Sequence, residues 1–391
     1  MKAESEFRNF WQDTAETYLP TTLQQSNASI KKDIIIVGSG IAALTTALVL
    51  QQEGKHCIVV SPVNLADANV KTGNLTTIPG IQNFQSKNIT GSKLQLLAKS
   101  KREAIDLVEG LINKYNIDCD FRYLTGYLFA QTAAEATLLE QTEAMATEAG
   151  VISTETNNLP ISLPFKKAYR FDFQAQLHPL KYLAGLATAF ESEGGVIWTG
   201  CSVTKVEENN GITVHTTSGT LHVQQVIYAG DGDHLNKTPF KGINRCCYNI
   251  AFVLKEDLYP EGISYDMSAP GHSFSTFASN GQKYIVATGF ENNDNHDGQV
   301  AFNELEKYLR NFFNIERVTH KWISEYHIGA DGLPNAGLMP GHKDIYVISA
   351  LGNNPIVNGS IAAKIVCSLI YNKHSGYEEL YNPQAVVQNG I

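Results

Sequence analysis

Apolar and polar positions follow one another in blocks that predict an α/β protein. The most informative block begins with Asp33 to Val37, a β-branched run typical of a buried parallel strand. Leu44 to Glu53 is rich in Ala, Leu and Thr and precedes Gly54, which predicts a helix with a glycine stop. Cys57 to Val60 predicts a second buried strand. Together these segments form a βαβ unit of ordinary length.

The rest of the chain predicts helices and strands around a β-rich middle. Helical spacing predicts helices at 94–116 (one long helix or two), 133–149, 179–193, 299–314 and 356–371. Strand patterns occur within 117–130 and at 168–173, 195–201, 203–207, 211–217, 220–223, 225–230, 251–254, 283–287 and 345–349. Because the βαβ start and a late strand–turn–helix unit bracket this middle, we expect a first domain that is discontinuous in sequence.

The turn between the first strand and its helix fits the fingerprint G-x-G-x-x-G/A. It consists of Gly38, Ser39, Gly40, Ile41, Ala42 and Ala43. Gly38 permits the tight turn, Gly40 lets the backbone approach a pyrophosphate, and Ala43 keeps helix and strand in close contact. The positive helix end and its free amides would receive the diphosphate. The context therefore predicts dinucleotide binding, with a tight turn that holds no ligand as the alternative.

The position that usually holds the ribose carries no acidic side chain. A Rossmann unit commonly has Asp or Glu at the end of its second strand, whereas this chain has Ser61 followed by Pro62. A serine hydroxyl accepts a hydrogen bond but brings no charge, so we expect a weaker or differently arranged adenosine contact. No Arg or Lys lies between Ser61 and Leu65, so a 2′-phosphate is not indicated either.

Length and composition indicate a globular protein of two joined domains. The 391 residues exceed one ordinary core, and 43% hydrophobic with 18% charged residues argue against disorder. The net charge of -9 argues against nucleic acid and against an anionic membrane surface as partners. No apolar run approaches ~20 residues, so no membrane span is expected.

The cysteines and the first thirty residues favour a cytoplasmic protein. The six cysteines are scattered without a C-x-x-C pair, so neither a disulfide framework nor a metal site is predicted. Residues 1–30 are polar and partly acidic, which does not fit a signal peptide. Their aromatic residues, among them Phe10 and Trp11, predict an arm that packs across the surface of the main domain.

Two further stretches hold candidate polar groups. Residues 64–77 follow the second strand, and Thr72 and Gly73 would offer a hydroxyl and an amide near a cofactor, although a plain surface loop fits equally well. His178 directly precedes Pro179 at the start of a predicted helix. For His178 we favour a structural, hydrogen-bonded histidine over a site residue.

With these elements in place, the chain resembles the D-amino-acid-oxidase-like (glycine-oxidase-like) family of FAD-dependent oxidoreductases. It is similar to the bacterial branch whose members often carry a C-terminal Rieske domain, although no Rieske cysteine–histidine pairs occur here. The resemblance covers nearly the whole chain, and the order and spacing of its motifs are more specific than any one of them. The matching stretches are Ile36–Ala47, Thr72-Gly73, Thr76-Thr77, Ile117–Phe121, Ala175–Leu183 and Asp331–Pro334.

The resemblance implies an α/β fold with two domains and an N-terminal arm. An FAD-binding, Rossmann-like domain of the glutathione-reductase type would pair with a substrate domain built on an antiparallel sheet. The arm would be 1–30, the FAD domain 31–115 with 172–235 and 325–391, and the substrate domain 116–171 with 236–324.

By the same resemblance, FAD would contact several separate parts of the chain. Gly38 to Ala43 would hold the diphosphate, Val203 would meet the adenine through its backbone, and Ala229 with Gly230 would line the cofactor. The turn before the last helix would face the flavin, with the positive helix end toward the pyrimidine side. This turn is Leu351, Gly352, Asn353, Asn354, Pro355 and Ile356. The remaining expected contacts are Ser61, Pro62, Thr72 and Gly73.

The chain departs from the family at positions that concern the site. Pro355 has no N–H to give the flavin, where the family turn is rich in glycine. Amino-acid oxidases of this family commonly anchor the substrate carboxylate with an arginine in the strand before Asp331, and no arginine follows Arg317 here. The candidate catalytic residues in this region are Tyr326, His327 and Asn354, with Tyr248 as a further candidate.

Three function classes remain open on these observations. The leading hypothesis is an FAD-dependent oxidoreductase that oxidises a small amine or a related C–N or C–O substrate by hydride transfer to flavin, with oxygen or a separate electron acceptor as partner. The second is a flavin-fold binding or regulatory protein without turnover, motivated by Ser61, Pro355 and the absent arginine. The third, a nicotinamide-dependent dehydrogenase, fits the β-rich middle less well.

Overall fold

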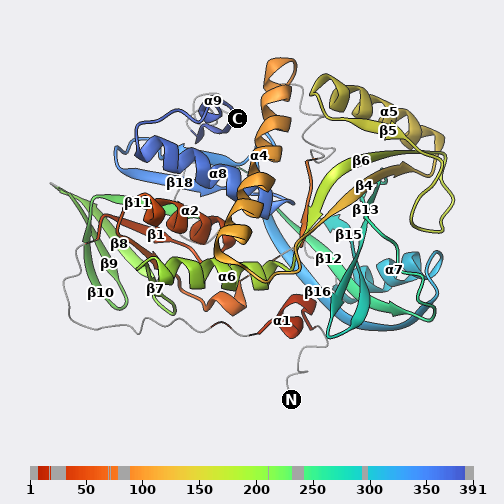
Figure 1. The fold of residues 1–391 in the computed structure, drawn as a ribbon, viewed down its shortest axis with the longest axis horizontal. Coiled ribbons are helices and arrows are strands. Elements are labelled where there is room, and N and C mark those ends of the chain that lie inside the picture. The colour runs from red at the N-terminus through yellow and green to blue at the C-terminus, as the bar shows by residue number, and fades with distance from the viewer. Residues whose placement is uncertain are drawn as a thin grey trace.

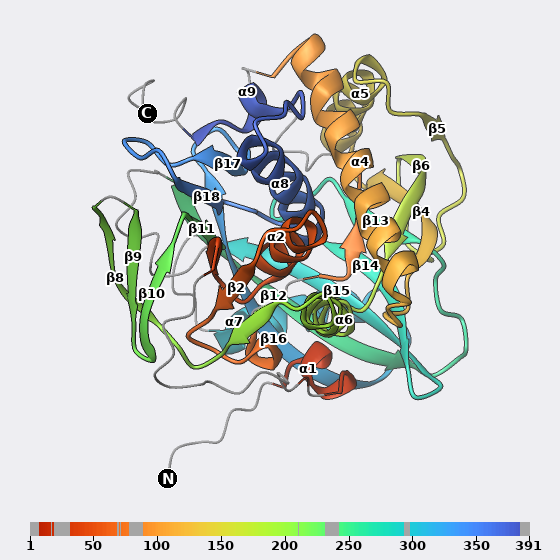
Figure 2. The ribbon, with the colours of Figure 1, turned by 60° about the vertical axis from the view of Figure 1, so that its left-hand side comes forward.

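Two large β-sheets of different kinds, a small three-stranded sheet and the helices around them form the described part of the protein (Figures 1 and 2). The structure is a computed structural model that describes residues 8–16, 18, 32–68, 70, 72–77, 89–209, 211–230, 242–292 and 298–383. In Figure 1 a largely parallel sheet with its helices lies on the left, and a larger, mostly antiparallel sheet lies on the right. This arrangement confirms the expected α/β fold with a Rossmann-like part and an antiparallel part.

The six-stranded sheet is built around the first predicted strand. Its order is β17 (Asn335–Leu338), β18 (Ile345–Ser349), β11 (Gln225–Ala229), β1 (Ile34–Val37), β2 (Cys57–Val60) and β7 (Val196–Trp198). All neighbouring strands run parallel except β17, which pairs antiparallel with β18 at one edge. The carboxyl ends of the parallel strands therefore meet at one edge of the sheet, where ligands of such folds bind.

Alternate side chains of β1 enter two different cores. Ile34 and Ile36 belong to the large core that contains the helices, whereas Ile35 and Val37 pack toward a three-stranded sheet on the other face. A strand covered on both faces explains the continuous apolar run in the sequence. The three-stranded sheet has the order β10 (Gly219–Val223), β9 (Ile212–Thr216) and β8 (Val203–Glu208).

Helices α2, α6 and α8 pack on the face of the six-stranded sheet opposite the three-stranded sheet, and α2 contacts α8 along its length. At Gly359 the contact leaves no room for a side chain, because an added Cβ would lie 2.9 Å from the Ala42 Cβ. The described helices are α1 (Phe10–Thr14), α2 (Ile41–Gln52), η1 (Leu65–Asp67, 3₁₀), α4 (Ser92–Tyr115), α5 (Ala133–Glu148), α6 (Pro179–Ser192), α7 (Gly298–Arg310), α8 (Pro355–Ile370) and α9 (Glu378–Tyr381). None of these described helices is long and apolar enough to cross a membrane.

The nine-stranded sheet forms the right-hand part of Figure 1. Its only parallel pair is β13 with β4, and β5 pairs with β6 beside the main order. The order is β16 (Ile315–Gly329), β12 (Gly242–Leu254), β15 (Gln282–Asn292), β14 (Ser273–Ser279), β13 (Ile263–Asp266), β4 (Arg122–Ala130), β6 (Lys167–Gln176) and β3 (Asn74–Leu75), with β5 at Ser153–Glu155.

The two faces of this sheet differ in chemistry. Register partners across five strands share what we call the inner face, which looks toward the large core: Tyr265, Ser273, Thr288, Asn249 and Trp322. The opposite, outer face carries an apolar cluster that packs against α7 and includes Tyr248, Ile250 and Phe252. Since successive strand residues point to opposite faces, the inner face is the one that can meet a ligand held by the six-stranded sheet.

Most predicted elements agree with the structure, and the differences have local causes. The helix predicted at 94–116 is one helix, Ser92–Tyr115, rather than two; α7 ends at Arg310 rather than at Asn314, and the strand predicted within 117–130 begins at Arg122. The 64–77 stretch is not a plain loop, because it contains η1 and the buried strand β3. The long strand β16 lacks a continuous apolar run, and its pattern did not predict it.

The aromatic residues of the N-terminal segment are buried rather than spread over the surface. Phe10 and Trp11, both fully buried, lie between α6 and the inner face of the nine-stranded sheet. The Trp11 ring meets Phe277 and His178 edge-on at centroid distances of 4.7 Å and 5.2 Å. These two rings therefore anchor the described helix α1 to the main body, and the arm expected at 1–30 stays a prediction; residues 1–7, 17 and 19–31 lie outside the described residues.

We expect Trp11→Ala to lower the free energy of unfolding by about 3–5 kcal/mol, because it leaves a cavity in a fully packed region. Urea denaturation checks this. Arg8→Ala is the control, since its ion pair with Asp13 is mostly exposed and its loss should cost at most about 1 kcal/mol. Equal losses in the two variants would contradict the burial of α1.

Candidate functional site

The turn between β1 and α2 presents free backbone amides. Gly40 is the N-cap of α2, and no side chain of the described residues caps the first amides of this helix. A Cβ on Gly38 would lie 2.0 Å from the Ala229 carbonyl oxygen, which fixes glycine at this position. A Cβ on Gly40 would meet no described atom within 4 Å. Open space in front of free helix amides is the feature that a diphosphate requires.

The segment Thr72 to Thr77 lies beside this edge of the sheet and is held by buried polar contacts. Gly73 has no room for a side chain, because an added Cβ would lie 2.0 Å from the Leu177 carbonyl oxygen. The Thr77 amide donates to Gln174 Oε1 at 2.7 Å, and the Gln176 side chain donates to Asn74 Oδ1 at 3.3 Å. The segment is therefore a fixed wall of the site.

The turn from Leu351 to Ile356 joins both sheets. The Gly352 amide donates to the His327 carbonyl at 3.0 Å, and Asn354 Nδ2 donates to the Thr76 carbonyl at 3.0 Å and to its hydroxyl at 3.2 Å. Pro355 occupies the first turn of α8, where its missing N–H costs nothing. Asn354 Oδ1 is buried and has no hydrogen-bond partner among the described residues. An orphaned acceptor of this kind fits a ligand that donates to it.

Tyr326 and His327, the neighbouring candidate residues on β16, lie on opposite faces of the nine-stranded sheet. Tyr326 is buried and its register partner is Arg245, on the inner face. His327 lies on the outer face, where its Nδ1 is 2.9 Å from Asn244 Oδ1 and its ring covers Gly242. Only the backbone of His327 reaches the turn before α8. Tyr326 and Asn354 therefore remain on the side of the site, whereas the His327 side chain does not.

Arg245 lies on the same inner face and is a candidate that the sequence analysis does not identify. It is half-buried, and no carboxylate of the described residues forms an ion pair with it. The family pattern directs attention to the strand before Asp331, but Arg245 comes from β12, the strand paired with it. Only the register between β12 and β16 reveals that Arg245 lies directly across from Tyr326, since nothing in the local sequence marks it.

Hydrogen bonds link the polar groups of the inner face. Thr288 Oγ1 donates to Asn249 Oδ1 at 2.7 Å, and Asn249 Nδ2 donates to Ser324 Oγ at 3.1 Å. Burial raises the pKa of Tyr265 to about 12, against the opposing effect of its contacts with Thr76 and Asn74. The hydroxyl of Tyr265 is therefore protonated and neutral at physiological pH. These hydrogen-bonded groups are neutral, and Arg245 adds a cation to the same face.

The remaining predicted cofactor residues fall into two groups. Ala229 and Gly230 end β11 directly beside Gly38, as a fingerprint strand requires. Ser61 is fully buried and its hydroxyl donates to the Val63 carbonyl at 2.7 Å, so it is not directed at a ribose. Pro62 is exposed, and Val203 begins β8 in the three-stranded sheet, paired with Thr216.

The other two candidate residues, Tyr248 and His178, make contacts that fit structural roles. Tyr248 belongs to the apolar outer-face cluster, where its ring meets Phe302 edge-on at 5.2 Å. His178 caps α6: its Nδ1 accepts from the Lys181 amide at 3.3 Å, and its Nε2 lies 2.9 Å from Thr14 Oγ1. Burial and the nearby Lys181 lower the pKa of His178 to about 4. The structural role expected for His178 agrees with these contacts.

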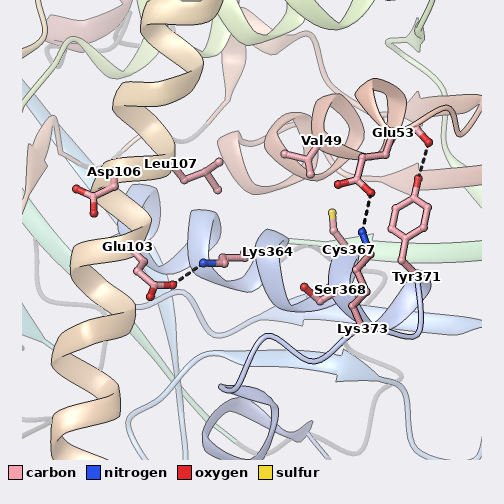
Figure 3. Close-up of a pocket in the computed structure, with 10 residues that line it drawn as sticks. All are labelled: Val49, Glu53, Glu103, Asp106, Leu107, Lys364, Cys367, Ser368, Tyr371 and Lys373. Carbon is pink, nitrogen blue, oxygen red and sulfur yellow. Dashed lines mark hydrogen bonds and ion pairs between the residues drawn. The ribbon is translucent and has the colours of Figure 1, made fainter.

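A groove between α2, α4 and α8 is a different feature (Figure 3). Lys364 pairs with Glu103 and Lys373 with Glu53 across it, and both pairs are partly exposed. Its α2 residues begin at Val49, which at 1.5 Å per residue is about 12 Å along the helix from Ile41. The groove therefore lies away from the turn at Gly38 to Ala43, toward the carboxyl ends of α2 and α8 and beside the middle of α4.

We expect the stability contribution of His178 to depend on pH. Its folded-state pKa lies below the unfolded value of 6.5, so the contribution is present above pH 6.5 and is lost as pH falls toward 4. His178→Asn keeps a good N-cap without this titration. Between pH 6.5 and pH 4 the free energy of unfolding of the wild type should fall by up to about 3 kcal/mol more than that of His178→Asn. Urea denaturation at several pH values measures this difference. Parallel stability curves would contradict this.

A known protein family and several known proteins are similar to this chain. The family model described as "FAD dependent oxidoreductase" (DAO) matches residues 33–369. YhfW of Bacillus subtilis (strain 168), named as a Rieske 2Fe-2S iron-sulfur protein, is 22% identical and covers 96% of this chain and 77% of its own length. Gamma-glutamylputrescine oxidoreductase of Escherichia coli (strain K12) is 21% identical over 96% of this chain and 91% of its own.

Among solved structures, glycine oxidase from Bacillus cereus ATCC 14579 has the same fold, with a TM-score of 0.71 at 16% identity. The alignment covers 90% of this chain and 98% of that enzyme. The free amides before α2, the open space at Gly40 and the orphaned Asn354 acceptor fit the cofactor that the family description names. The resemblance predicted from the sequence is confirmed, and the chain belongs to the DAO family of FAD-dependent oxidoreductases.

Proposed function

We propose that the protein oxidises the carbon–nitrogen bond of a small amine that carries a carboxylate. The observation that supports this most directly is the meeting of three segments beneath one polar sheet face. The diphosphate turn, the Thr72–Thr77 wall and the turn before α8 share one edge, and Asn354 bonds two of them together. The amine and amino-acid substrates named for the relatives agree with this class.

The cofactor placement is part of this proposal. The amides at Gly40 to Ala43 would hold the FAD diphosphate at the positive end of α2, and Ala229 with Gly230 would line the bound nucleotide. The turn from Leu351 to Ile356 would face the flavin, with the positive end of α8 toward its pyrimidine side. Since Ser61 is engaged with Val63, backbone groups rather than an acidic side chain would bind the ribose.

Arg245 supports a substrate with a carboxylate. An arginine that is half-buried and lacks a carboxylate among the described residues is suited to bidentate binding of an anion. Its position across from Tyr326 puts the charge beside an aromatic ring on the inner face. Arg245 would thus take the part that the family gives to an arginine in the strand before Asp331.

The chemistry of the step is oxidation by hydride loss. FAD, when bound, supplies the two-electron acceptor. In the neutral amine, the C–H bond next to nitrogen breaks with its electron pair, and the nitrogen lone pair completes the C=N bond of an iminium ion that water hydrolyses. The chain's part is to orient the substrate through Arg245 and Tyr326. Oxygen or a separate electron acceptor would complete the cycle.

We propose the division of the chain given above as its functional organisation. Strands from 34–60, 196–229 and 335–349 share the six-stranded sheet, which supports a discontinuous FAD domain. Strands from 122–176 and 242–329 build the sheet whose inner face would hold the substrate. The short connection at Asp331, whose Oδ1 accepts from the Leu333 amide at 3.0 Å, joins the two sheets.

Gly40→Leu should abolish FAD binding while the protein still folds. The backbone at Gly40 has a φ of -91°, which any residue adopts, and the new side chain would fill the space for the diphosphate without a clash. We expect no flavin absorbance after reconstitution and an unfolding free energy within about 1 kcal/mol of the apo wild type. Gly110→Ala, in an exposed position of α4, is the control that should keep FAD. Stoichiometric FAD in Gly40→Leu would refute the placement.

The substrate class is tested by anaerobic bleaching of the flavin absorbance. Each amino acid in a panel is matched with the amine that lacks its carboxylate, so that the two differ in one group. We expect amino acids to reduce the flavin, and Arg245→Met to raise their KM about 10- to 150-fold with little effect on the matched amines, since a hydrogen bond to a charged group contributes about 1.5–3 kcal/mol.

Arg170→Met is the matched control, because Arg170 pairs with Asp172 on the surface. It should leave all kinetic constants near those of the wild type. A protein that binds FAD but is bleached by no amine or amino acid would overturn the proposed reaction. An equal effect of Arg245→Met on both members of each pair would overturn the role of Arg245.

A further inference from the structure

Lys101 is a fully buried lysine without an acidic partner. It lies on α4, is 2% exposed, and no carboxylate of the described residues forms an ion pair with it. Its position continues the apolar stripe of Leu94, Leu97 and Ala104 at helical spacing, where a charged residue is unexpected. Burial lowers the pKa of Lys101 to about 7. A lysine kept in such a position without a counter-charge calls for an explanation.

The lysine is connected to the turn that we place at the flavin. Its ammonium group donates to Asn358 Oδ1 on α8. The same amide donates from Nδ2 to the Leu351 carbonyl at 2.6 Å, and the Asn358 amide N–H bonds to the Asn354 carbonyl at 2.9 Å. The Asn358 side chain thus links Lys101 to the Leu351 end of the turn, and the Asn358 backbone bonds to Asn354 as the first turn of α8.

Two groups contribute positive potential at the turn before α8. The amino end of α8 contributes a partial positive charge, and no side-chain cap lies on its N-cap Asn354. Lys101 adds its ammonium group behind the first turns of the same helix. Two like charges in a dry region oppose each other, so the arrangement is favourable only when a negative charge occupies the space in front of the turn.

We propose that Lys101 is a positioning residue for the flavin: through Asn358 it holds the turn from Leu351 to Asn354, and its charge favours the reduced cofactor. This inference depends on the flavin placement under the proposed function. Reduced flavin gathers negative charge on its pyrimidine side, and a fixed cation nearby stabilises that charge without reorganisation. The residue acts through Asn358 and through the field, and it does not touch substrate.

Two variants separate the charge from the hydrogen bond. Lys101→Met removes both while it keeps an unbranched side chain of similar length, and Lys101→Gln keeps a donor for Asn358 without the charge. The matched control is Lys364→Met on α8, because Lys364 pairs with Glu103 in the partly exposed groove at the other end of the helix (Figure 3). The readouts are the FAD dissociation constant, the midpoint potential of bound FAD against reference dyes, and the thermal unfolding of the apo proteins.

We expect both Lys101 variants to bind FAD and to favour its reduced form at least tenfold less than the wild type. For a two-electron couple, tenfold corresponds to a midpoint potential about 30 mV lower. Lys364→Met should keep the wild-type potential. Apo Lys101→Met should unfold at the same temperature as the apo wild type or higher, since it removes a buried charge that has no acidic partner among the described residues.

The outcomes distinguish the two proposals. An unchanged potential in both FAD-loaded Lys101 variants would overturn this inference and leave the proposed function standing. A wild-type potential in Lys101→Gln alone would overturn the role of the charge. Lower stability of apo Lys101→Met together with an unchanged potential in Lys101→Gln would mark a merely structural lysine. A wild-type protein that takes up no FAD would overturn the proposed function itself, and this inference with it.

Discussion

The close contact between α2 and α8 determines where every other part of the site is assembled. At Gly359 the two helices meet with almost no side chain between them. Each follows a parallel strand of the six-stranded sheet, so both helices start at the carboxyl edge of that sheet and their positive ends lie there together. The Thr72–Thr77 wall and the end of β16 then join the turn before α8 through Asn354 and Gly352.

The distribution of cations around this edge adds a second constraint. The chain has a net charge of -9, so carboxylates are abundant, yet Arg245 and Lys101 form no ion pair with any described carboxylate. What sets these two apart from other unpaired cations is burial, since Lys101 is fully buried and Arg245 half-buried. The unpaired cations come from opposite sides, one from the inner sheet face and one from α4. The site therefore combines positive charge with neutral polar groups, which suits anionic ligands.

The sequence predicts local elements of this protein well and their assembly less well. The strand at 57–60 and the turn at Gly38 follow from residues that are neighbours in the chain, where periodicity and glycine spacing carry the information. The inner face depends on pairings between distant strands, so neither the position of Arg245 nor the outward direction of His327 was predictable. The local sequence does mark Lys101, as a charged residue within an apolar helical stripe. Its partner Asn358 is distant in sequence, so their contact was not predictable.

The buried N-terminal helix has a consequence for how small molecules enter and leave. Phe10 and Trp11 contact rings of the nine-stranded sheet on one side and, through His178, the start of α6 on the other. Any hinge motion between the two halves would expose both rings to water, and each fully buried aromatic side chain is stabilised by about 1.5–3 kcal/mol. For the two rings together this cost of about 3–6 kcal/mol opposes opening between α6 and the nine-stranded sheet, so small local movements are favoured over separation of the two halves.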